Sequence, residues 1–156
     1  MGPLPESDGF FYILCLCEYM SKLVVLIPTR TKSALECADG IITHYISIYG
    51  CPVHLHGDQD PSWQSELFTE MCKILGVTRT RTTPHHPAGD GMVERYNRTV
   101  QQMLKIFVNE SRSDWASLLP LLSMAIRSTP SEPTGCSPNL LVFGHELAMP
   151  IDVLVR

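Results

Sequence analysis

A β-prone stretch at residues 10–27 places the strongest constraint on the fold. It is rich in β-branched, aromatic and aliphatic residues, and polar positions interrupt it near residues 18–22. Two strands joined by a tight turn fit this pattern. Strands joined in this way pair antiparallel, so a sheet that contains them is at least partly antiparallel. For Glu18, inside the interruption, we expect a role on the surface or in the turn.

A helix is predicted after this hairpin. Ser33 followed by Glu36 is a possible capping box, and apolar residues recur at helical spacing until Gly50 ends the run. The recurring residues are Leu35, Ala38, Ile42, Tyr45, Ile46 and Tyr49. We expect this stripe to be the buried face of an amphipathic helix.

A strand, a helix and another strand follow. Residues 53–56 alternate like a short strand, and Asp58 comes soon after them, so Asp58 should lie at a strand end. Apolar residues at helical spacing over residues 63–75 predict a second helix, which Gly76 closes. Residues 77–83 are again β-prone.

The last third of the chain predicts two helices. Residues 92–109 form a long helix with Met92, Tyr96, Val100, Met103 and Phe107 on its apolar side. A final helix spans about residues 115–127, with Ser113 or Asp114 as its cap and Pro120 kinking or restarting it. The order strand, strand, helix, strand, helix, strand, helix, helix predicts an α/β fold.

Composition limits the class of protein. The 156 residues, 44% hydrophobic and 18% charged, predict one compact domain. The longest apolar stretches fall far short of the roughly 20 residues that cross a bilayer, and the N-terminus lacks a signal-peptide pattern, so we expect an intracellular protein without membrane contact. The six cysteines form no Cys-x-x-Cys pair, which favours reduced, buried thiols. The net charge of -4 argues weakly against nucleic-acid binding, although one basic face could supply the phosphate contacts.

The long helix carries a polar strip opposite its apolar side. The strip consists of Glu94, Asn97, Arg98, Gln101 and Lys105, at offsets of 0, 3, 4, 7 and 11 positions. An ordinary solvated face would have the same pattern. However, the turn at residues 89–91 places Glu94 in the first helical turn beside a loop. From there a carboxylate can reach a site built by a neighbouring strand end.

Asp58 is the natural partner of Glu94. Their numbers differ by 94 − 58 = 36, so 35 residues lie between the two carboxylates. This spacing resembles the D,D-35-E signature of retroviral and retrotransposon integrases. The flanking sequences, HGDQ at residues 56–59 and HPAGDGMVERYNR at residues 86–98, strengthen the resemblance. The second resembles the family's HPQ, Asp-Gly and E-R-x-N run, with Ala88 in place of the usual glutamine.

The resemblance covers nearly the whole chain, from GPLP at residues 2–5 to VFG at residues 142–144, and is similar to the Ty3/gypsy branch. It implies an RNase H-like fold with a mixed sheet flanked by helices, and assigns residues 1–156 to the catalytic core. The family's zinc-binding N-terminal domain and β-rich C-terminal domain have no counterpart in this sequence. In the family the first acid lies in a strand about two residues upstream of Met1, so we expect that strand to be largely missing here. We therefore expect the isolated chain to be inactive, and only marginally stable unless residues 1–6 replace part of that strand.

The resemblance also implies a chemistry. Asp58 and Glu94 would be catalytic residues and ligands of two Mg²⁺ or Mn²⁺ ions, which activate an attacking oxygen and stabilise a leaving one. The residues expected to bind DNA are His86, Asn97, Arg98, Gln101 and Lys105. The implied reactions are processing of DNA 3′ ends and strand transfer, carried out by a homo-oligomer on element-end and target DNA. This setting is nuclear or cytoplasmic.

Several alternatives stay open. The chain could be an inactive or domesticated integrase-derived module that binds nucleic acid or a partner, or an RNase H-like nuclease. Asp60 could compete for metal, although a cap on the second helix is the favoured role. Two histidine pairs, His54 with His56 and His85 with His86, could hold zinc. However, structural zinc sites usually also contain cysteine pairs.

Overall fold

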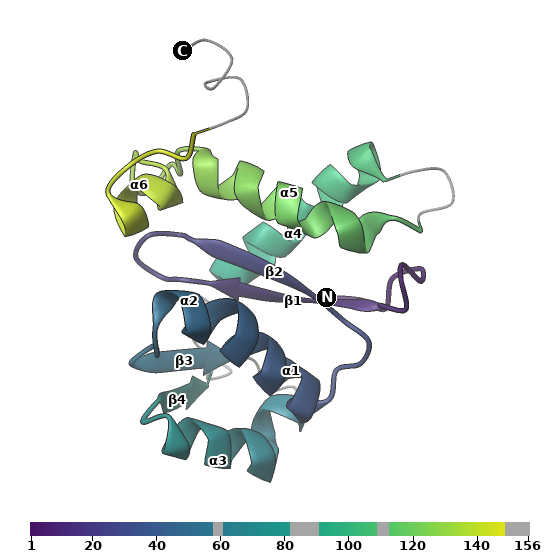
Figure 1. Cartoon of the computed structure of the whole chain (residues 1–156), viewed down its shortest axis with the longest axis vertical. Coiled ribbons are helices and arrows are strands. Elements are labelled where there is room, and N and C mark those ends of the chain that lie inside the picture. The colour runs from purple at the N-terminus through teal and green to yellow at the C-terminus, as the bar shows by residue number, and fades with distance from the viewer. Residues whose placement is uncertain (58–60, 82–90, 109–112, 149–156) are drawn as a thin grey trace.

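The computed structural model describes residues 1–57, 61–81, 91–108 and 113–148. A β-hairpin lies in the middle of the molecule, with α4, α5 and α6 on one side of it (Figure 1). The helix that begins with α1 lies on the other side, together with β3, β4 and α3. Within the described ranges, no helix combines the length and apolar character needed to cross a membrane.

The predicted hairpin is confirmed. Strands β1 (Tyr12–Cys17) and β2 (Val24–Thr29) pair antiparallel. The carboxylate of Glu18 accepts hydrogen bonds in the connecting turn from the Met20 N–H at 2.9 Å and from the N–H and hydroxyl of Ser21 at 2.6 Å each. Glu18 therefore has the turn role expected from the sequence.

The hairpin is buried on both faces. Alternate residues of a strand point to opposite faces, so Val24 and Leu26 join one core and Val25 and Ile27 the other. The first core contains residues of β1, α4 and α5, while the second contains residues of α1, α3 and the connection into β4. The hairpin is thus the central layer that holds the two groups of helices together.

The helical region after the hairpin departs from the prediction. It consists of α1 (Ala34–Ile41), a π-helical segment η1 (Ile42–Ile46) and α2 (Ser47–Tyr49). Ser33 is the N-cap of α1 and accepts a hydrogen bond from the Glu36 N–H, as predicted. The Glu36 carboxylate, however, binds the N–H groups of Arg30 and Thr31, so the reciprocal half of the capping box is wrong.

The buried face of α1 is also displaced from the predicted stripe. Leu35 is 67% exposed and Ile42 is 42% exposed, whereas Gly40 and Ile41 are buried. A Cβ on Gly40 would lie 3.4 Å from a side-chain carbon of Ile27. The helix therefore approaches the hairpin through its glycine, which a search for large apolar side chains overlooks.

Strands β3 (His54–Gly57) and β4 (Thr78–Arg81) form a separate parallel pair. A 3-10 helix, η2 (Pro61–Gln64), and α3 (Glu66–Ile74) lie between them in the chain. Both predicted strands are confirmed. The N-cap of α3 is Ser65. Asp60, which we expected to cap the second helix, lies outside the described residues.

The remaining helices are α4 (Gly91–Phe107), α5 (Trp115–Ser128) and α6 (Pro138–Phe143). The long predicted helix is confirmed, but Phe107 is 61% exposed and Leu104 is buried instead. Helix α5 continues through Pro120, so the predicted restart is wrong. Asp114 stands at its N-cap without a side-chain cap hydrogen bond. The sequence did not predict α6.

All six cysteines are free thiols, as predicted. Cys37 and Cys72 are buried, but Cys51 is exposed, which contradicts the expectation that all six would be buried. Cys51 lies just before β3, outside both cores.

Candidate functional site

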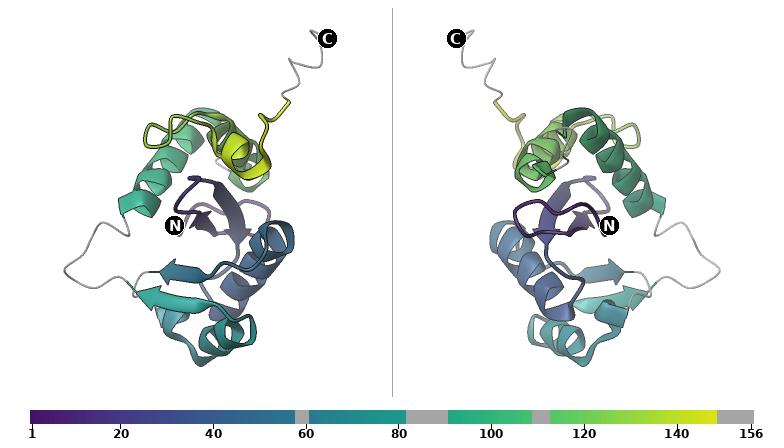
Figure 2. Two further views of the ribbon diagram at one scale, coloured as in Figure 1. Left: turned by 90° about the vertical axis from the view of Figure 1, so that its left-hand side faces the viewer. Right: turned by 90° about the vertical axis from the view of Figure 1, so that its right-hand side faces the viewer.

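Glu94 lies in the first turn of α4 and is exposed. Figure 2 shows that α4 begins on the side of the molecule toward which β3 and β4 both point. A carboxylate in a first helical turn is favoured by the positive end of the helix dipole. Among the described residues, no ion pair to Glu94 is found.

Asp58 directly follows Gly57, the last residue of β3. The predicted position of Asp58 after a strand end is therefore correct along the chain. Asp58 itself lies outside the described residues, and so does His86. The proximity of Asp58 to Glu94 and the DNA contact of His86 stay predictions.

The polar strip of α4 is not uniform. Four of its residues are exposed: Glu94, Arg98, Gln101 and Lys105. Asn97 is half-buried, and its carbonyl oxygen Oδ1 is buried with no hydrogen-bond partner among the described residues. A buried acceptor without a donor destabilises the fold, so this oxygen is a cost that the rest of the domain offsets. The binding of DNA by the strip stays a prediction.

The groups between α4 and β1 are uncharged near neutral pH. Burial raises the pKa of the Cys15 thiol to about 11, and burial together with neighbouring Cys15 raises the pKa of Cys17 to about 12. Burial and the nearby Cys17 also raise the pKa of Tyr96 on α4. These side chains therefore place no negative charge beneath the helix that carries Glu94.

The described residues around the strand ends form a second part of the site. The Nδ1 atom of His56 lies 3.0 Å from the Thr80 hydroxyl across the β3–β4 pair. The Arg79 guanidinium donates a hydrogen bond to the backbone carbonyl of Trp63. The indole of Trp63 packs against Gly57, where an added Cβ would lie 3.1 Å from two ring carbons. No sequence pattern pointed to Arg79, because an arginine side chain has many possible hydrogen-bond partners.

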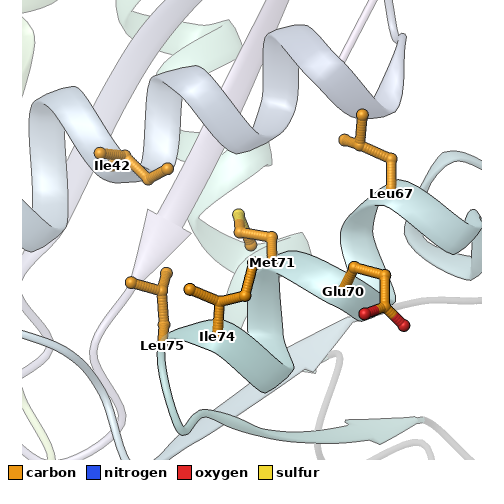
Figure 3. Close-up of a pocket in the computed structure, with 6 residues that line it drawn as sticks. All are labelled: Ile42, Leu67, Glu70, Met71, Ile74 and Leu75. Carbon is orange, nitrogen blue, oxygen red and sulfur yellow. The ribbon is translucent and has the colours of Figure 1, made fainter.

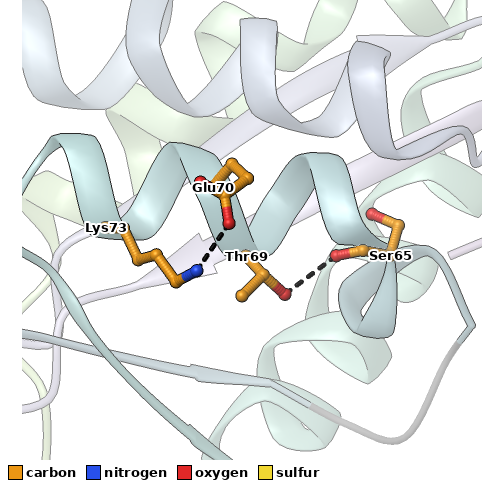
Figure 4. A network of polar contacts seen from close by, with 4 residues as sticks. All are labelled: Ser65, Thr69, Glu70 and Lys73. Carbon is orange, nitrogen blue, oxygen red and sulfur yellow. Dashed lines mark hydrogen bonds and ion pairs between the residues drawn. The ribbon is translucent and has the colours of Figure 1, made fainter.

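Helix α3, which follows this region, is fixed at its start. Ser65 caps the helix, and its carbonyl accepts a hydrogen bond from the Thr69 hydroxyl at 2.9 Å (Figure 4). Lys73 and Glu70 form an exposed ion pair further along at 2.6 Å. An exposed pair of this kind contributes little to stability, so the cap is the more important contact.

A groove elsewhere on the molecule is almost entirely apolar. It lies between η1 and α3 and is lined by Ile42, Leu67, Glu70, Met71, Ile74 and Leu75 (Figure 3). None of the predicted site residues lines it. One carboxylate at its edge does not make a metal or phosphoryl site, so we place the candidate site at α4 and the strand ends.

The donor chemistry fits a hard divalent cation. Mg²⁺ prefers carboxylate oxygens, and the exposed Glu94 in the first turn of α4 can supply them. Within the described part of the chain, no group of three or more His, Cys, Asp or Glu residues is placed to hold a metal ion. His54 and His56 are exposed on β3, and His85 and His86 are outside the described residues, so the zinc alternative gains no support.

No family model matches the chain. Over 150 residues, the chain is 29% identical to the Pro-Pol polyprotein of simian foamy virus type 1. This match covers 96% of this chain and 13% of that polyprotein. Over 151 residues, it is 30% identical to the retrovirus-related Pol polyprotein from transposon 412 of Drosophila melanogaster. This match covers 96% of this chain and 12% of that polyprotein. The chain is homologous to one segment of these Pol polyproteins. It spans about one eighth of their length.

Solved structures of similar fold agree with this homology. The integrase core of BIV matches with a TM-score of 0.71 and 24% identity, over 89% of both chains. A second match is a chain of the simian T-cell lymphotropic virus intasome, solved in complex with the PP2A regulatory subunit B56 gamma. The TM-score is 0.77 and the identity is 20%, and the match covers 92% of this chain and 52% of that one. The HTLV-2 integrase core in complex with magnesium matches with a TM-score of 0.67 and 16% identity, over 91% of this chain and 99% of that one. The fold is that of a retroviral integrase catalytic core, which confirms the predicted RNase H-like class.

Proposed function

We propose that this chain is the catalytic core of a retroelement integrase, which processes DNA 3′ ends and joins them to target DNA. The observation that carries the proposal is the exposed Glu94 at the start of α4, on the side to which β3 leads just before Asp58. The homology to Pol polyproteins and the integrase-core fold support it.

Asp58 and Glu94 would bind the divalent cations, two Mg²⁺ or Mn²⁺ ions in the intact site. The HTLV-2 core was solved with magnesium, which supports the choice of metal. Bound cations of this kind activate the attacking oxygen and stabilise the leaving one.

The residues of α4 would hold the DNA. Arg98 and Lys105 offer cationic donors to phosphate oxygens, and Gln101 and Asn97 offer amides. With His86 they would keep one phosphodiester in place while an oxygen of water or of a DNA 3′-hydroxyl forms a bond to phosphorus. The bond from phosphorus to the leaving oxygen breaks in the same step, so the number of phosphorus–oxygen bonds is unchanged. Water gives end processing and the 3′-hydroxyl gives strand transfer.

Element-end and target DNA would be the partners, bound by a homo-oligomer in the nucleus or cytoplasm. The related cores of HTLV-2 occur in trimeric and dimeric forms, and a similar chain is part of an intasome, which supports an oligomer. The net charge of -4 means that the phosphate contacts would come from a local basic surface such as Arg98 and Lys105.

A strand-transfer assay with an oligonucleotide that matches the element end tests the proposal. We expect the printed chain to give little or no product alone, because a site without the family's first acid cannot hold both ions. Joined to a segment that supplies this aspartate, it should become active with Mg²⁺ or Mn²⁺. Asp58→Asn and Glu94→Gln should each abolish that activity.

Arg30→Gln removes a charge from an exposed position outside the candidate site and serves as the control. If Asp58→Asn or Glu94→Gln left the rate within a few-fold of the parent, the assignment of that residue would be wrong. DNA binding without any metal-dependent joining in the joined protein would favour the alternative, an inactive or domesticated binding module.

A further inference from the structure

The charge of α4 differs in sign from that of the rest of the chain. Its charged residues are all exposed: Glu94, Arg95, Arg98 and Lys105. Three cations and one acid give the helix a formal charge of 3 − 1 = +2. The whole chain has a net charge of -4, so everything outside α4 sums to (-4) − (+2) = -6. A basic helix on an otherwise acidic chain indicates a surface for an anionic partner.

Four exposed side chains of α4 form a row without an acid, which we call the basic row. They follow one another at spacings of three, four and three positions: Arg95, Arg98, Gln102 and Lys105. At about 100° per residue, these spacings keep the row within a sector of about 80° of the helix surface. The row covers 105 − 95 = 10 steps along the helix, so it is about 15 Å long.

The charge of the basic row is not offset by a nearby acid in the described part of the structure. Glu94 lies four positions before Arg98, which is the spacing of an ion pair on a helix. Among the described residues, however, no carboxylate forms an ion pair with Arg95, Arg98 or Lys105. The row therefore presents three cationic groups to the solvent.

The shape of the basic row fits a chain of phosphates better than a single anion. A single small anion is bound where several polar groups converge, whereas these side chains are spread along about 15 Å. One strand of duplex DNA carries a phosphate about every 3.4 Å along the helix axis, so the row can face about four phosphates. Guanidinium groups bind phosphate oxygens through two parallel hydrogen bonds, and an amide also donates to them.

We propose that the basic row binds the phosphodiester backbone of duplex DNA, with Arg95 and Gln102 as DNA-binding residues in addition to those named above. On the helix surface both lie on the side of Arg98 away from Gln101, so they widen the DNA-binding surface of α4. Phosphate contacts do not depend on base sequence, so the row binds any duplex. This inference rests on the proposed function, because that function makes DNA the ligand.

Binding of the 156-residue chain to a labelled DNA duplex of arbitrary sequence tests the inference. Fluorescence anisotropy between about 50 and 200 mM salt gives the affinity, and EDTA excludes any contribution from bound cations. Affinity falls as salt rises, and each phosphate contact that is lost makes this dependence less steep by about 0.9 in log affinity against log salt. Arg95→Gln should show this loss. Gln102→Lys adds a cation to the row, so it should tighten binding and make the dependence steeper by a similar amount.

Lys73→Gln and Thr43→Lys are the matched controls. Both positions are exposed, on α3 and η1, across the hairpin from α4 (Figure 1). They change the net charge by the same amounts as Arg95→Gln and Gln102→Lys, and should leave the salt dependence as in the parent. Melting temperatures show that all four variants fold, since exposed substitutions alter stability little.

Two results would overturn the inference. One is a parent chain that does not bind the duplex at the lowest salt concentration. The other is an effect of Arg95→Gln no larger than that of Lys73→Gln, together with an effect of Gln102→Lys no larger than that of Thr43→Lys.

The failure of the proposed function has a different signature. Metal-dependent joining would then be absent from the protein that carries the first aspartate, while DNA binding and its weaker salt dependence in Arg95→Gln persist. If joining occurs and Arg95→Gln leaves the salt dependence unchanged, the proposed function stands and the role of the basic row alone is wrong.

Discussion

The backbone N–H of Ala116 donates a hydrogen bond to the side-chain hydroxyl of Ser7, 3.1 Å away and 109 positions earlier in the chain. Ala116 is the second residue of α5, where backbone N–H groups have no partner within the helix. The neighbouring Trp115 indole donates to the Pro5 carbonyl at 2.6 Å. Asp114 is the N-cap residue of α5, as predicted, but the side-chain acceptor for the first helical turn comes from the N-terminal segment.

Replacing Ser7 with alanine should lower the free energy of unfolding by about 1–2 kcal/mol, because a buried helix-end N–H loses its acceptor. The melting temperature should fall by roughly 3–6 °C in a domain of this size. Urea denaturation and calorimetry measure both quantities. Ser47→Ala is the control, since the Ser47 hydroxyl is exposed and bonds only to the carbonyl of Thr43. Equal losses in the two variants would contradict the capping role.

Asn97→Leu should stabilise the isolated chain by about 1 kcal/mol, because it removes a buried acceptor that has no donor. Under the proposed function, the same change should reduce DNA joining in the protein that carries the first aspartate. Gln101→Leu, on the exposed part of the same helix, should change stability by less than about 0.5 kcal/mol. Chemical denaturation measures the free energy of unfolding of the two variants. A destabilised Asn97→Leu would show that Oδ1 of Asn97 accepts a hydrogen bond in the folded protein.

Glu18 should make the hairpin turn sensitive to acid. Burial raises the pKa of this carboxyl, but hydrogen bonds from the Met20 N–H and from the hydroxyl and N–H of Ser21 outweigh it and lower the pKa below 4.5. A lowered folded-state pKa means that the ionised group stabilises the fold at neutral pH. This contribution is lost as the pH falls below 4.5 and through the folded-state pKa.

Glu18→Gln should therefore be less stable than the parent at pH 7, and the difference should shrink as the pH falls below 4.5. Thermal melts over a pH series give the comparison. Glu132→Gln removes the same charge at an exposed position and serves as the reference. A difference between Glu18→Gln and the parent that stayed constant over the whole series would rule out the linkage.

The outer edge of β1 should accept a further strand. Met1 and Ile13 exchange both backbone hydrogen bonds, at 2.8 and 2.9 Å, so the N-terminal segment already pairs with the outer edge of β1. Extending the chain before Met1 by on the order of ten β-prone residues should continue this pairing toward Cys15 and Cys17. Each backbone group that gains a partner removes a cost of about 1–3 kcal/mol, so the melting temperature should rise by several degrees and aggregation should fall.

An extension of equal length with proline at alternate positions cannot supply the ladder N–H groups and is the control. Calorimetry and light scattering measure the two effects. The prediction fails if the 156-residue chain is a monomer that melts cooperatively and neither extension changes its melting temperature.

The sequence was most informative where structure depends on neighbours in the chain. Glu94 could be placed on an exposed helical face because the period of α4 is set by residues three and four apart. The hairpin could be predicted because its strands and turn are contiguous. The expected face of α1 failed at Leu35 and Ile42, since Gly40 makes the close approach to Ile27 and has no side chain to signal it.

The sequence alone determined the order of most strands and helices and the identity of the two candidate acids, because periodicity, turn residues and the 35-residue spacing are properties of the chain. Only the tertiary structure decided that Ser7 caps α5 and that Arg79 holds the carbonyl of Trp63. A hydroxyl or a guanidinium can bond to many carbonyls and N–H groups. Which one it meets depends on how the two cores bring distant segments together, and no local pattern in the chain records that.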